Sequence, residues 1–342
     1  MNKPNIGIFV VLAALVLLPG SVMAQALEKT KITIAVGGKN LFYYLPLTIA
    51  ERRGFFKDEG LNVEIVDFPG GARALQAMVG GSADIVSGAY EHTINMQAKG
   101  IKIVGIALQG RYSGIVLGVH KNRAAQYKSP KDLKGWKIGV TAPGSSTNMM
   151  VSSLLAKDGL KPDAVSIIGV GATAGAVAAL RKGELDAMSN LDPVISRLEA
   201  SGDIITVVDT RTAKGMKEVY GGAYHAGCIY APADWLKKNP NTAQAVVNAM
   251  VRAVRWLQTA RADEVVATVP PEYYGDDPTL YKVALLKNTE GFSQDGLFTA
   301  EGAKNVFSVL NSFEPSVQAA KIDLSKTYDN SFAQKALKKI RY

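Results

Sequence analysis

The chain contains an internal repeat. Residues 62–89 align with residues 164–191 without a gap, and each segment reads as a strand, a turn of small residues, a helix, a Gly-x-x-Asp step and a second strand. The two Gly-x-x-Asp steps begin at Gly81 and Gly183. A repeat of this length constrains the fold more than any single motif does. Because two copies are too few for a solenoid, the repeat predicts two similar α/β lobes with a cleft between them.

Predicted strands and helices alternate through most of the chain. The β-branched segment 31–36 predicts a strand, and the same alternation resumes at 136–140 after a polar loop at 121–134. Strands that alternate with helices form βαβ units and mostly parallel sheets. From about Pro232 the sequence becomes helical, and 242–260 carries the single apolar face of a long buried helix. The pattern therefore predicts the α/β fold class, with a mostly parallel sheet in each lobe.

The first 24 residues have the character of a secretory signal peptide. Lys3 supplies the positive start, 6–18 is apolar, and Val22-Met23-Ala24 offers a cleavage site of small residues. The apolar run is shorter than the roughly 20 residues that a membrane helix needs, and an uncleaved anchor is the alternative. We expect cleavage after Ala24 and export of the mature chain.

Charge and cysteine content exclude several function classes. The chain has 39 Lys and Arg against 30 Asp and Glu, a net charge of +9. These basic residues are scattered, so the pattern does not indicate nucleic-acid binding. The densest basic group, 335–341, is typical of a solvated last helical turn. The single cysteine, Cys228, has no partner for an internal disulfide, and its small and apolar neighbours indicate a buried thiol.

Catalytic and metal-binding patterns find little support in the sequence. The histidines His92, His120 and His225 lack metal-ligand spacing, and a Gly-x-Ser-x-Gly nucleophile elbow is absent. Glu91 and Asp192 lie on predicted cleft loops and form a candidate acid–base pair, but helix capping and hydrogen bonding to a ligand are the alternatives. We therefore expect no metal, no cofactor and no catalytic centre.

The candidate ligand site is formed by the loops that follow the predicted strands. In parallel α/β sheets ligands bind beyond the carboxyl ends of the strands, where helices begin with unpaired N–H groups. The loop at 141–148 resembles a phosphate-binding turn but lacks the lysine of a nucleotide P-loop. For each Ser, Thr or Asp, helix capping is the alternative role. The predicted ligand-binding residues are Asn40, Phe42, Tyr43, Gly70, Gly71, Tyr90, Glu91, Ser145, Ser146, Thr147, Thr173, Asn190, Asp192 and Tyr224.

Several segments together resemble one family of exported receptors. Residues 44–64 read YLPLTIAERRGFFKDEGLNVE, which is similar to the opening of ABC-transporter substrate-binding proteins of the nitrate, sulfonate and taurine type, the NMT1/THI5-like family. Three further segments agree with the family: VGGSADI at 79–85, DLKGWKIGV at 132–140 and GELDA at 183–187. The resemblance spans about 31–260.

The resemblance implies a periplasmic binding protein of type II, in which two Rossmann-like lobes with parallel-rich sheets are joined by two crossover segments. The first lobe would comprise 25–117 and 226–342 and the second 118–225, with crossovers near Leu117 and near 224–229. The implied function is to bind a small solute in the inter-lobe cleft by hinge closure and to deliver it to an ABC permease in the inner membrane. The protein would be a periplasmic monomer.

The sequence leaves the ligand open. Helix N-termini and the positive net charge favour a small organic anion such as a sulfonate or a carboxylate, whereas Glu91 and Asp192 favour an amine or a ring nitrogen. Pyrimidine-precursor binders and some enzymes share the implied fold, although the pyrimidine-synthesising relatives carry a cysteine cluster that this chain lacks. An exported lyase or hydrolase that uses Glu91 and Asp192, and a sensor subunit, are the alternative functions.

Overall fold

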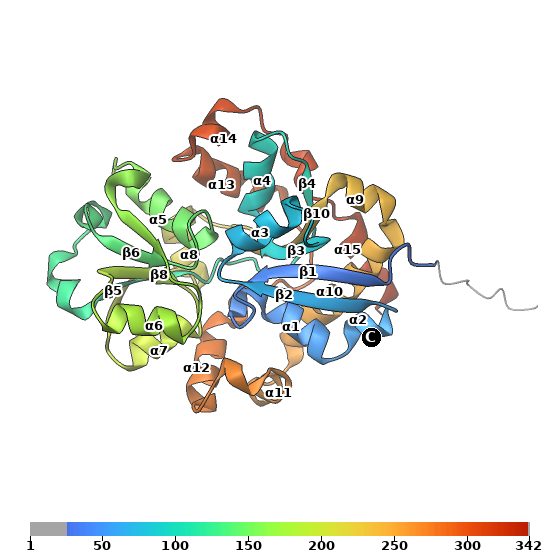
Figure 1. Cartoon of the computed structure of the whole chain (residues 1–342), viewed down its shortest axis with the longest axis horizontal. Helices are drawn as coiled ribbons and strands as arrows, with labels where there is room; N and C mark the ends of the chain where they lie inside the picture. The colour runs from blue at the N-terminus through green and yellow to red at the C-terminus, as the bar shows by residue number, and fades with distance from the viewer. Residues whose placement is uncertain (1–25, 341–342) are drawn as a thin grey trace, which may run out of the picture.

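The protein is described by a computed structural model that covers residues 26–340. The predicted signal peptide, 1–24, lies outside the described residues. Figure 1 shows two α/β lobes side by side, and each is built around one sheet of five strands. Within residues 26–340 no helix has the length and apolar character needed to cross a membrane.

The first sheet combines parallel strands with one reversed strand. Its order is β2-β1-β3-β10-β4, with β1 parallel to β2 and β3, and with β10 antiparallel to β3 and β4. Its strands are β1 (Lys31–Gly37), β2 (Asn62–Phe68), β3 (Ile85–Ala89), β4 (Ile103–Leu108) and β10 (Gly227–Pro232). Segment 224–229, implied to be a crossover, therefore enters the first sheet and pairs between two of its strands.

The second sheet repeats this plan. Its order is β7-β6-β8-β5-β9, with β6 parallel to β7 and β8, and with β5 antiparallel to β8 and β9. Its strands are β5 (Val116–His120), β6 (Lys137–Val140), β7 (Ser166–Gly169), β8 (Ala187–Asn190) and β9 (Ile204–Asp209). The repeat seen in the sequence corresponds to β2-α3-β3 in one lobe and β7-α6-β8 in the other. The predicted α/β class with parallel-rich sheets is confirmed.

Helices cover both faces of each sheet (Figure 1). In the second lobe they are α5 (Ser146–Lys157), α6 (Ala174–Arg181), α7 (Val194–Ala200) and α8 (Ala213–Tyr220). In the first lobe they are α1 (Leu45–Arg52), α2 (Phe55–Asp58), α3 (Gly71–Val79), α4 (Glu91–Ala98), α9 (Ala233–Lys238), α10 (Pro240–Thr259), α11 (Ala262–Thr268), α12 (Pro278–Asn288), α13 (Ala300–Asn311), α14 (Pro315–Ala319) and α15 (Ser331–Lys339). The polar loop predicted at 121–134 contains two 3-10 helices, Lys121–Gln126 and Pro130–Leu133.

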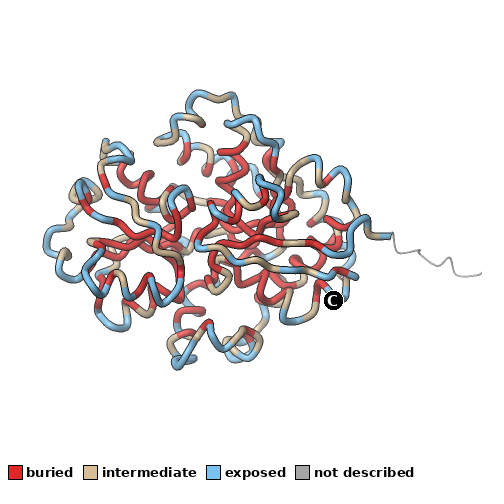
Figure 2. Tube along the Cα trace, in the orientation of Figure 1, coloured by how far each residue is buried: buried red, intermediate tan, exposed pale blue. Residues whose placement is uncertain are grey.

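The long helix α10 anchors the C-terminal half of the chain to the first sheet. Val246, Val247, Met250 and Val251 are at most 1% exposed, as the predicted apolar face requires. The helix packs against α1, α15 and β4. Buried residues gather along both sheets and where the lobes meet (Figure 2).

Two chain segments pass between the sheets and lie side by side. One joins β4 to β5 and the other joins β9 to β10. The amide of Ala226 donates to the carbonyl of Gly110 at 3.0 Å, and the amide of Thr210 donates to the carbonyl of Ile115 at 3.0 Å. We propose that the lobe boundaries fall within these paired segments, at 109–115 and 210–226. This assignment places all of β5 in the second lobe, whereas the sequence-based boundary at 117 divides that strand.

Candidate functional site

The lobes meet where the strand-end loops of the two sheets face each other. The amide of Phe42 donates to the carbonyl of Asp192 at 3.1 Å, and the side-chain amide of Asn40 donates to the carbonyl of Ala172 at 2.9 Å. The amide of Ala72 donates to the hydroxyl of Ser145 at 3.0 Å. Each of these bonds joins a loop of the first lobe to a loop of the second.

A glycine permits this close approach. A Cβ added to Gly70 would lie 2.8 Å from the Cβ of Ala142 and 2.9 Å from its nitrogen. Because real Cβ atoms do not approach other atoms so closely, any larger residue at this position would push the lobes apart.

A small cavity of about 20 Å³ lies at this junction. That volume suffices for about one or two water molecules. Hydroxyl-bearing side chains from both lobes dominate its wall, which consists of Gly37, Leu41, Tyr43, Tyr44, Gly71, Ala89, Thr141, Ser145, Ser146, Thr147 and Leu191. Two larger and more open grooves, of about 750 and 950 Å³, lie elsewhere between elements of the two lobes.

The second-lobe wall of the cavity is the first turn of α5 and the loop before it. Ser145 is the N-cap residue, so Ser146 and Thr147 present their side chains beside the unpaired amides of the helix start. The hydroxyl of Thr147 accepts from the amide of Thr141 at 3.1 Å and lies 2.9 Å from the Thr141 hydroxyl. These bonds fix the shape of the loop at the cavity.

Glu91 adjoins the cavity from the first lobe. It is the first residue of α4, directly after β3, and it is 1% exposed. The hydroxyl of Tyr224 donates to its Oε1 at 3.2 Å, while its Oε2 has no hydrogen-bond partner within residues 26–340. Burial raises the pKa of Glu91 to about 7, against the smaller lowering effects of its own backbone, Ser146 and Tyr224.

Buried tyrosines surround this carboxyl group. Burial raises the pKa of each hydroxyl, and the nearby Glu91 charge raises it further, for Tyr43, Tyr44, Tyr220 and Tyr224. The rings of Tyr220 and Tyr224 stack with their centroids 4.0 Å apart. The tyrosines therefore stay protonated at neutral pH and offer both hydrogen-bond donors and acceptors.

Other titratable groups nearby are neutral or tied to the fold. His92 Nδ1 lies 3.0 Å from the hydroxyl of Tyr230, and burial lowers the pKa of His92 to about 4. Cys228 is a free, buried thiol whose pKa burial raises. Among residues 26–340 no group of three or more His, Cys, Asp or Glu side chains is placed to hold a metal ion.

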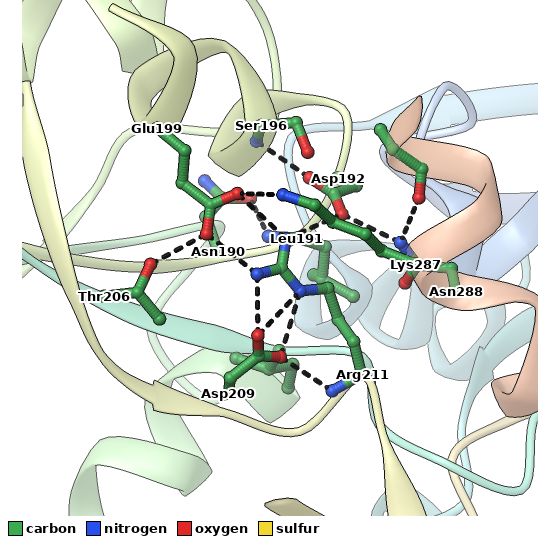
Figure 3. A network of polar contacts seen from close by, with 12 residues as sticks. Asn190, Leu191, Asp192, Ser196, Glu199, Thr206, Asp209, Arg211, Lys287 and Asn288 are labelled. Carbon is green, nitrogen blue, oxygen red and sulfur yellow. Dashed lines mark hydrogen bonds and ion pairs between the residues drawn. The ribbon is translucent and has the colours of Figure 1, made fainter. Parts of the chain in front are cut away.

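Asp192 belongs to a network of polar contacts outside the cavity (Figure 3). Its Oδ1 accepts from the amide of Ser196 at 2.8 Å, and its Oδ2 accepts from the side chains of Asn288 at 2.8 Å and Arg211 at 3.1 Å. Arg211 also contacts Glu199 at 2.8 Å and Asp209 at 2.7 Å. Both carboxylate oxygens of Asp192 therefore have partners in the fold.

The network ties α7 of the second lobe to α12 of the first lobe. Lys287 of α12 lies 2.8 Å from Glu199 of α7. Burial alone would raise the pKa of Glu199, but hydrogen bonds from Arg211, Lys287 and Thr206 lower it to about 2. Glu199 is consequently ionised at neutral pH and stabilises the contact between the lobes.

The predicted ligand-binding residues separate into three groups. Those that line or adjoin the cavity are Tyr43, Gly71, Glu91, Ser145, Ser146, Thr147 and Tyr224. Those that hold the strand-end loops together are Asn40, Phe42, Gly70 and Asn190, the last donating to the carbonyl of Gly171 at 3.0 Å. Those that the structure does not bring to the cavity are Tyr90, Thr173 and Asp192.

Each residue of the third group has another partner. The hydroxyl of Tyr90 lies 2.5 Å from that of Thr327, and its ring packs against His225. Thr173 accepts from the amide of Gly175 and so caps α6. These contacts match the capping and core roles that were the alternatives in the sequence.

Sequence reasoning missed Tyr44, Thr141 and Tyr220. Tyr44 follows Tyr43 in the 3-10 turn Phe42–Tyr44, where successive side chains lie close together. Tyr220 is the last residue of α8 and precedes Tyr224 by four residues, but α8 itself was not predicted. Thr141 begins the loop at 141–148, and its place in that loop was the available signal in the sequence. In the structure its hydroxyl lies beside that of Thr147.

Two sheets that each contain one reversed strand, linked by two paired crossovers, define the periplasmic binding protein fold. The alkanesulfonate-binding protein SsuA from Xanthomonas axonopodis pv. citri, solved with bound MOPS, has this fold. It superposes with a TM-score of 0.71 over 90% of this chain and 100% of its own, at 19% identity.

Residues 41–261 match the family described as NMT1/THI5 like, and the chain belongs to that family. A solved structure from Bordetella bronchiseptica RB50 is 58% identical and superposes with a TM-score of 0.90, covering 92% of this chain and 99% of that one. YtlA of Bacillus subtilis (strain 168), provisionally named a binding protein, is 25% identical over 78% of this chain and 79% of its own. The match to 4-amino-5-hydroxymethyl-2-methylpyrimidine phosphate synthase of Schizosaccharomyces pombe is shorter, 28% identical over 47% of this chain and 44% of that enzyme.

Proposed function

We propose that this protein is the exported solute-binding receptor of an ABC importer. Its family and fold support this function, and so does its similarity to YtlA. The observation that carries the proposal is the cavity, because its wall is divided between two lobes that only two adjacent chain segments connect. Rotation about those segments would open the cavity to solvent and admit a solute.

Closure of the lobes would couple solute binding to transport. The hydrogen bonds of Phe42, Asn40 and Ala72 across the junction exist only when the lobes are together. A solute that contacts both walls binds the closed state more tightly than the open one and shifts the equilibrium toward it. An inner-membrane permease would then recognise the closed monomer in the periplasm.

The chemistry of the solute has two candidates. The N-terminus of α5 and the hydroxyls of Ser146 and Thr147 support the organic anion that the sequence favoured. The buried carboxyl of Glu91 supports an amine or a ring nitrogen instead.

An exported lyase or hydrolase on the same fold finds less support. That function paired Glu91 with Asp192 as acid and base. Both oxygens of Asp192 accept hydrogen bonds from Ser196, Asn288 or Arg211, so neither oxygen is free to transfer a proton to or from a substrate. The synthase relative is matched over less than half of its length.

Small-angle X-ray scattering of the mature protein, combined with native mass spectrometry, tests the receptor function. We expect a solute to co-purify from the bacterial periplasm unchanged in mass, and the radius of gyration to fall when that solute is returned to the stripped protein. A radius that stays the same with every solute that binds would contradict the proposal. Conversion of the solute on incubation would favour an enzyme.

A further inference from the structure

Three buried oxygen atoms at the junction of the lobes have no hydrogen-bond partner in the described part of the chain. They are Oε2 of Glu91, Oγ of Ser146 and the hydroxyl of Tyr43. An unpaired buried polar atom costs about 1–3 kcal/mol, and folded proteins contain few of them. These three come from α4, α5 and the 3-10 turn after β1, so both lobes contribute to the group.

The three side chains face one spot. The Ser146 side chain lies near both Glu91 and Tyr43 and lowers the pKa of each, against the larger effect of burial. Ser146 and Tyr43 also line the cavity itself. A solute that opens and enlarges the cavity would therefore meet the oxygens of Ser146 and Tyr43, with that of Glu91 beside them.

The site formed by these three oxygen atoms is either neutral or negatively charged, depending on whether Glu91 is protonated. No lysine or arginine is among the residues that line the cavity within 26–340. The groups that interact with Glu91, namely Ser146, Tyr224 and its own backbone, are uncharged. Since Tyr224 already donates to Oε1, the carboxyl group has one free acceptor oxygen and no counter-ion.

We propose, resting on the receptor function above, that the solute is a small organic molecule with a protonated or N–H-bearing nitrogen that donates to Glu91. Its other polar atoms meet the hydroxyls of Ser146 and Tyr43. A sulfonate or a carboxylate has no hydrogen to donate, and beside an ionised Glu91 it would be repelled. The contacts at the cavity thus favour the nitrogen-bearing class over the organic anion.

Binding should then depend on pH through Glu91. The titratable groups that its charge reaches are Tyr43 and Tyr44 after β1, Tyr220 and Tyr224 in and after α8, and Cys228 and Tyr230 in β10. Burial raises the pKa of every one of them, so they stay neutral near pH 7, and burial lowers the pKa of the adjacent His92 to about 4. Affinity for a permanently cationic solute should rise between pH 6 and pH 8 as Glu91 loses its proton.

Calorimetric titration with matched probes tests the proposal. The nitrogen-bearing probes are benzylamine, benzamidine and propylamine, and their anionic counterparts are benzoate, benzenesulfonate and propionate. At pH 8 we expect at least one nitrogen-bearing probe to bind tenfold or more tightly than its counterpart. Glu91→Gln should lose at least tenfold of that affinity, whereas Glu64→Gln on the exposed surface of β2 should not change it.

Two further variants keep the test valid if Glu91→Gln folds poorly. Tyr43→Phe and Ser146→Ala should each weaken binding of the same probe several-fold. Anions that bind while amines do not, or full affinity in Glu91→Gln, would overturn the nitrogen assignment and leave the receptor function standing. Binding of neither probe set to folded protein would count against both.

Discussion

Glu91 and Asp192 occupy corresponding places in the two lobes, and their surroundings differ. Each lies two residues beyond a central strand, Glu91 after β3 and Asp192 after β8, and each is 1% exposed. Asp192 meets a guanidinium, an amide side chain and a backbone N–H, whereas Glu91 meets one tyrosine hydroxyl and keeps an oxygen unpaired. A carboxylate two residues beyond a central strand thus holds the fold together in the second lobe and adjoins the cavity in the first.

The difference shows how a buried carboxylate can be interpreted. A charge removed from water is tolerated when it is paired and hydrogen-bonded, and then it serves stability. Burial raises the pKa of an unpaired carboxylate and leaves an oxygen free to accept from a ligand, which is the state expected of a binding residue. Four predictions test whether Asp192 and Glu91 differ in this way.

The largest effect should follow removal of Arg211. Arg211→Ala leaves Asp192, Glu199 and Asp209 without their shared cation, and breaking a buried ion pair in this way costs about 3–5 kcal/mol. Urea unfolding followed by circular dichroism measures the loss. The control Arg73→Ala, on the exposed face of α3, should change stability by less than about 0.5 kcal/mol. A loss below about 1 kcal/mol for Arg211→Ala would mean that the network is not structural.

Glu91→Gln should stabilise the folded protein, whereas Arg211→Ala destabilises it. The pKa of Glu91 is about 7 in the folded protein and about 4.5 when unfolded, so between these values the folded state holds a proton that the unfolded state releases. The free energy of unfolding of the wild type therefore falls as pH rises from 4.5 to 7, whereas that of Glu91→Gln shows no such fall. We expect the solute-free variant to exceed the wild type by up to about 3 kcal/mol at pH 8 and by little at pH 4.5. A variant less stable than the wild type at pH 8 would contradict the unpaired state.

Glu199 should respond to acid in the reverse direction. Its pKa is lowered to about 2, so its contribution is present above pH 4.5 and is lost as pH falls toward 2. We expect Glu199→Gln to cost about 2 kcal/mol at pH 7, since the side chain is partly exposed, and to cost little at pH 2. Unfolding curves at both pH values measure the two costs, and equal costs would show that charge pairing is not the cause.

The smallest effect should come from the lobe junction. Gly70 has an extended backbone, with φ of −170°, so Gly70→Ala strains nothing in the open state, but its new Cβ meets Ala142 on closure. We expect unchanged unfolding and a roughly tenfold loss of affinity for the co-purified solute, which is about 1.4 kcal/mol. Gly175→Ala is a matched control, because nothing lies closer than 3.6 Å to its added Cβ. Unchanged affinity in Gly70→Ala would show that the solute binds without closure of this contact.

The regular elements could be predicted because their signals are local. The alternation at 31–36, the repeat at 62–89 and 164–191, and the apolar face of α10 each correspond to an element of the structure. The reversed strands were not predictable in the same way, because side-chain alternation does not encode the direction of a neighbouring strand. Segment 224–229 was therefore interpreted as a crossover, although residues 227–229 belong to strand β10, which lies between β3 and β4.

Helix α8 was missed for a similar reason. Gly215 lowers helix propensity in the middle of Ala213–Tyr220. A Cβ at Gly215 would lie 1.7 Å from the carbonyl oxygen of Asp209, so the glycine is required by the packing of α8 against the end of β9. The local sequence argued against the helix, while a contact with the preceding strand end explains the residue.

The amino-acid sequence was sufficient to predict two similar α/β lobes with polar and aromatic residues after their strands. Which of those residues lie at the cavity depends on the packing of the lobes. The two side chains that donate to Asp192, Arg211 and Asn288, lie 19 and 96 residues away along the chain, and no comparable cation reaches Glu91. Whether a buried carboxylate is paired depends on the positions of distant side chains, and these are fixed only when the lobes have folded and met.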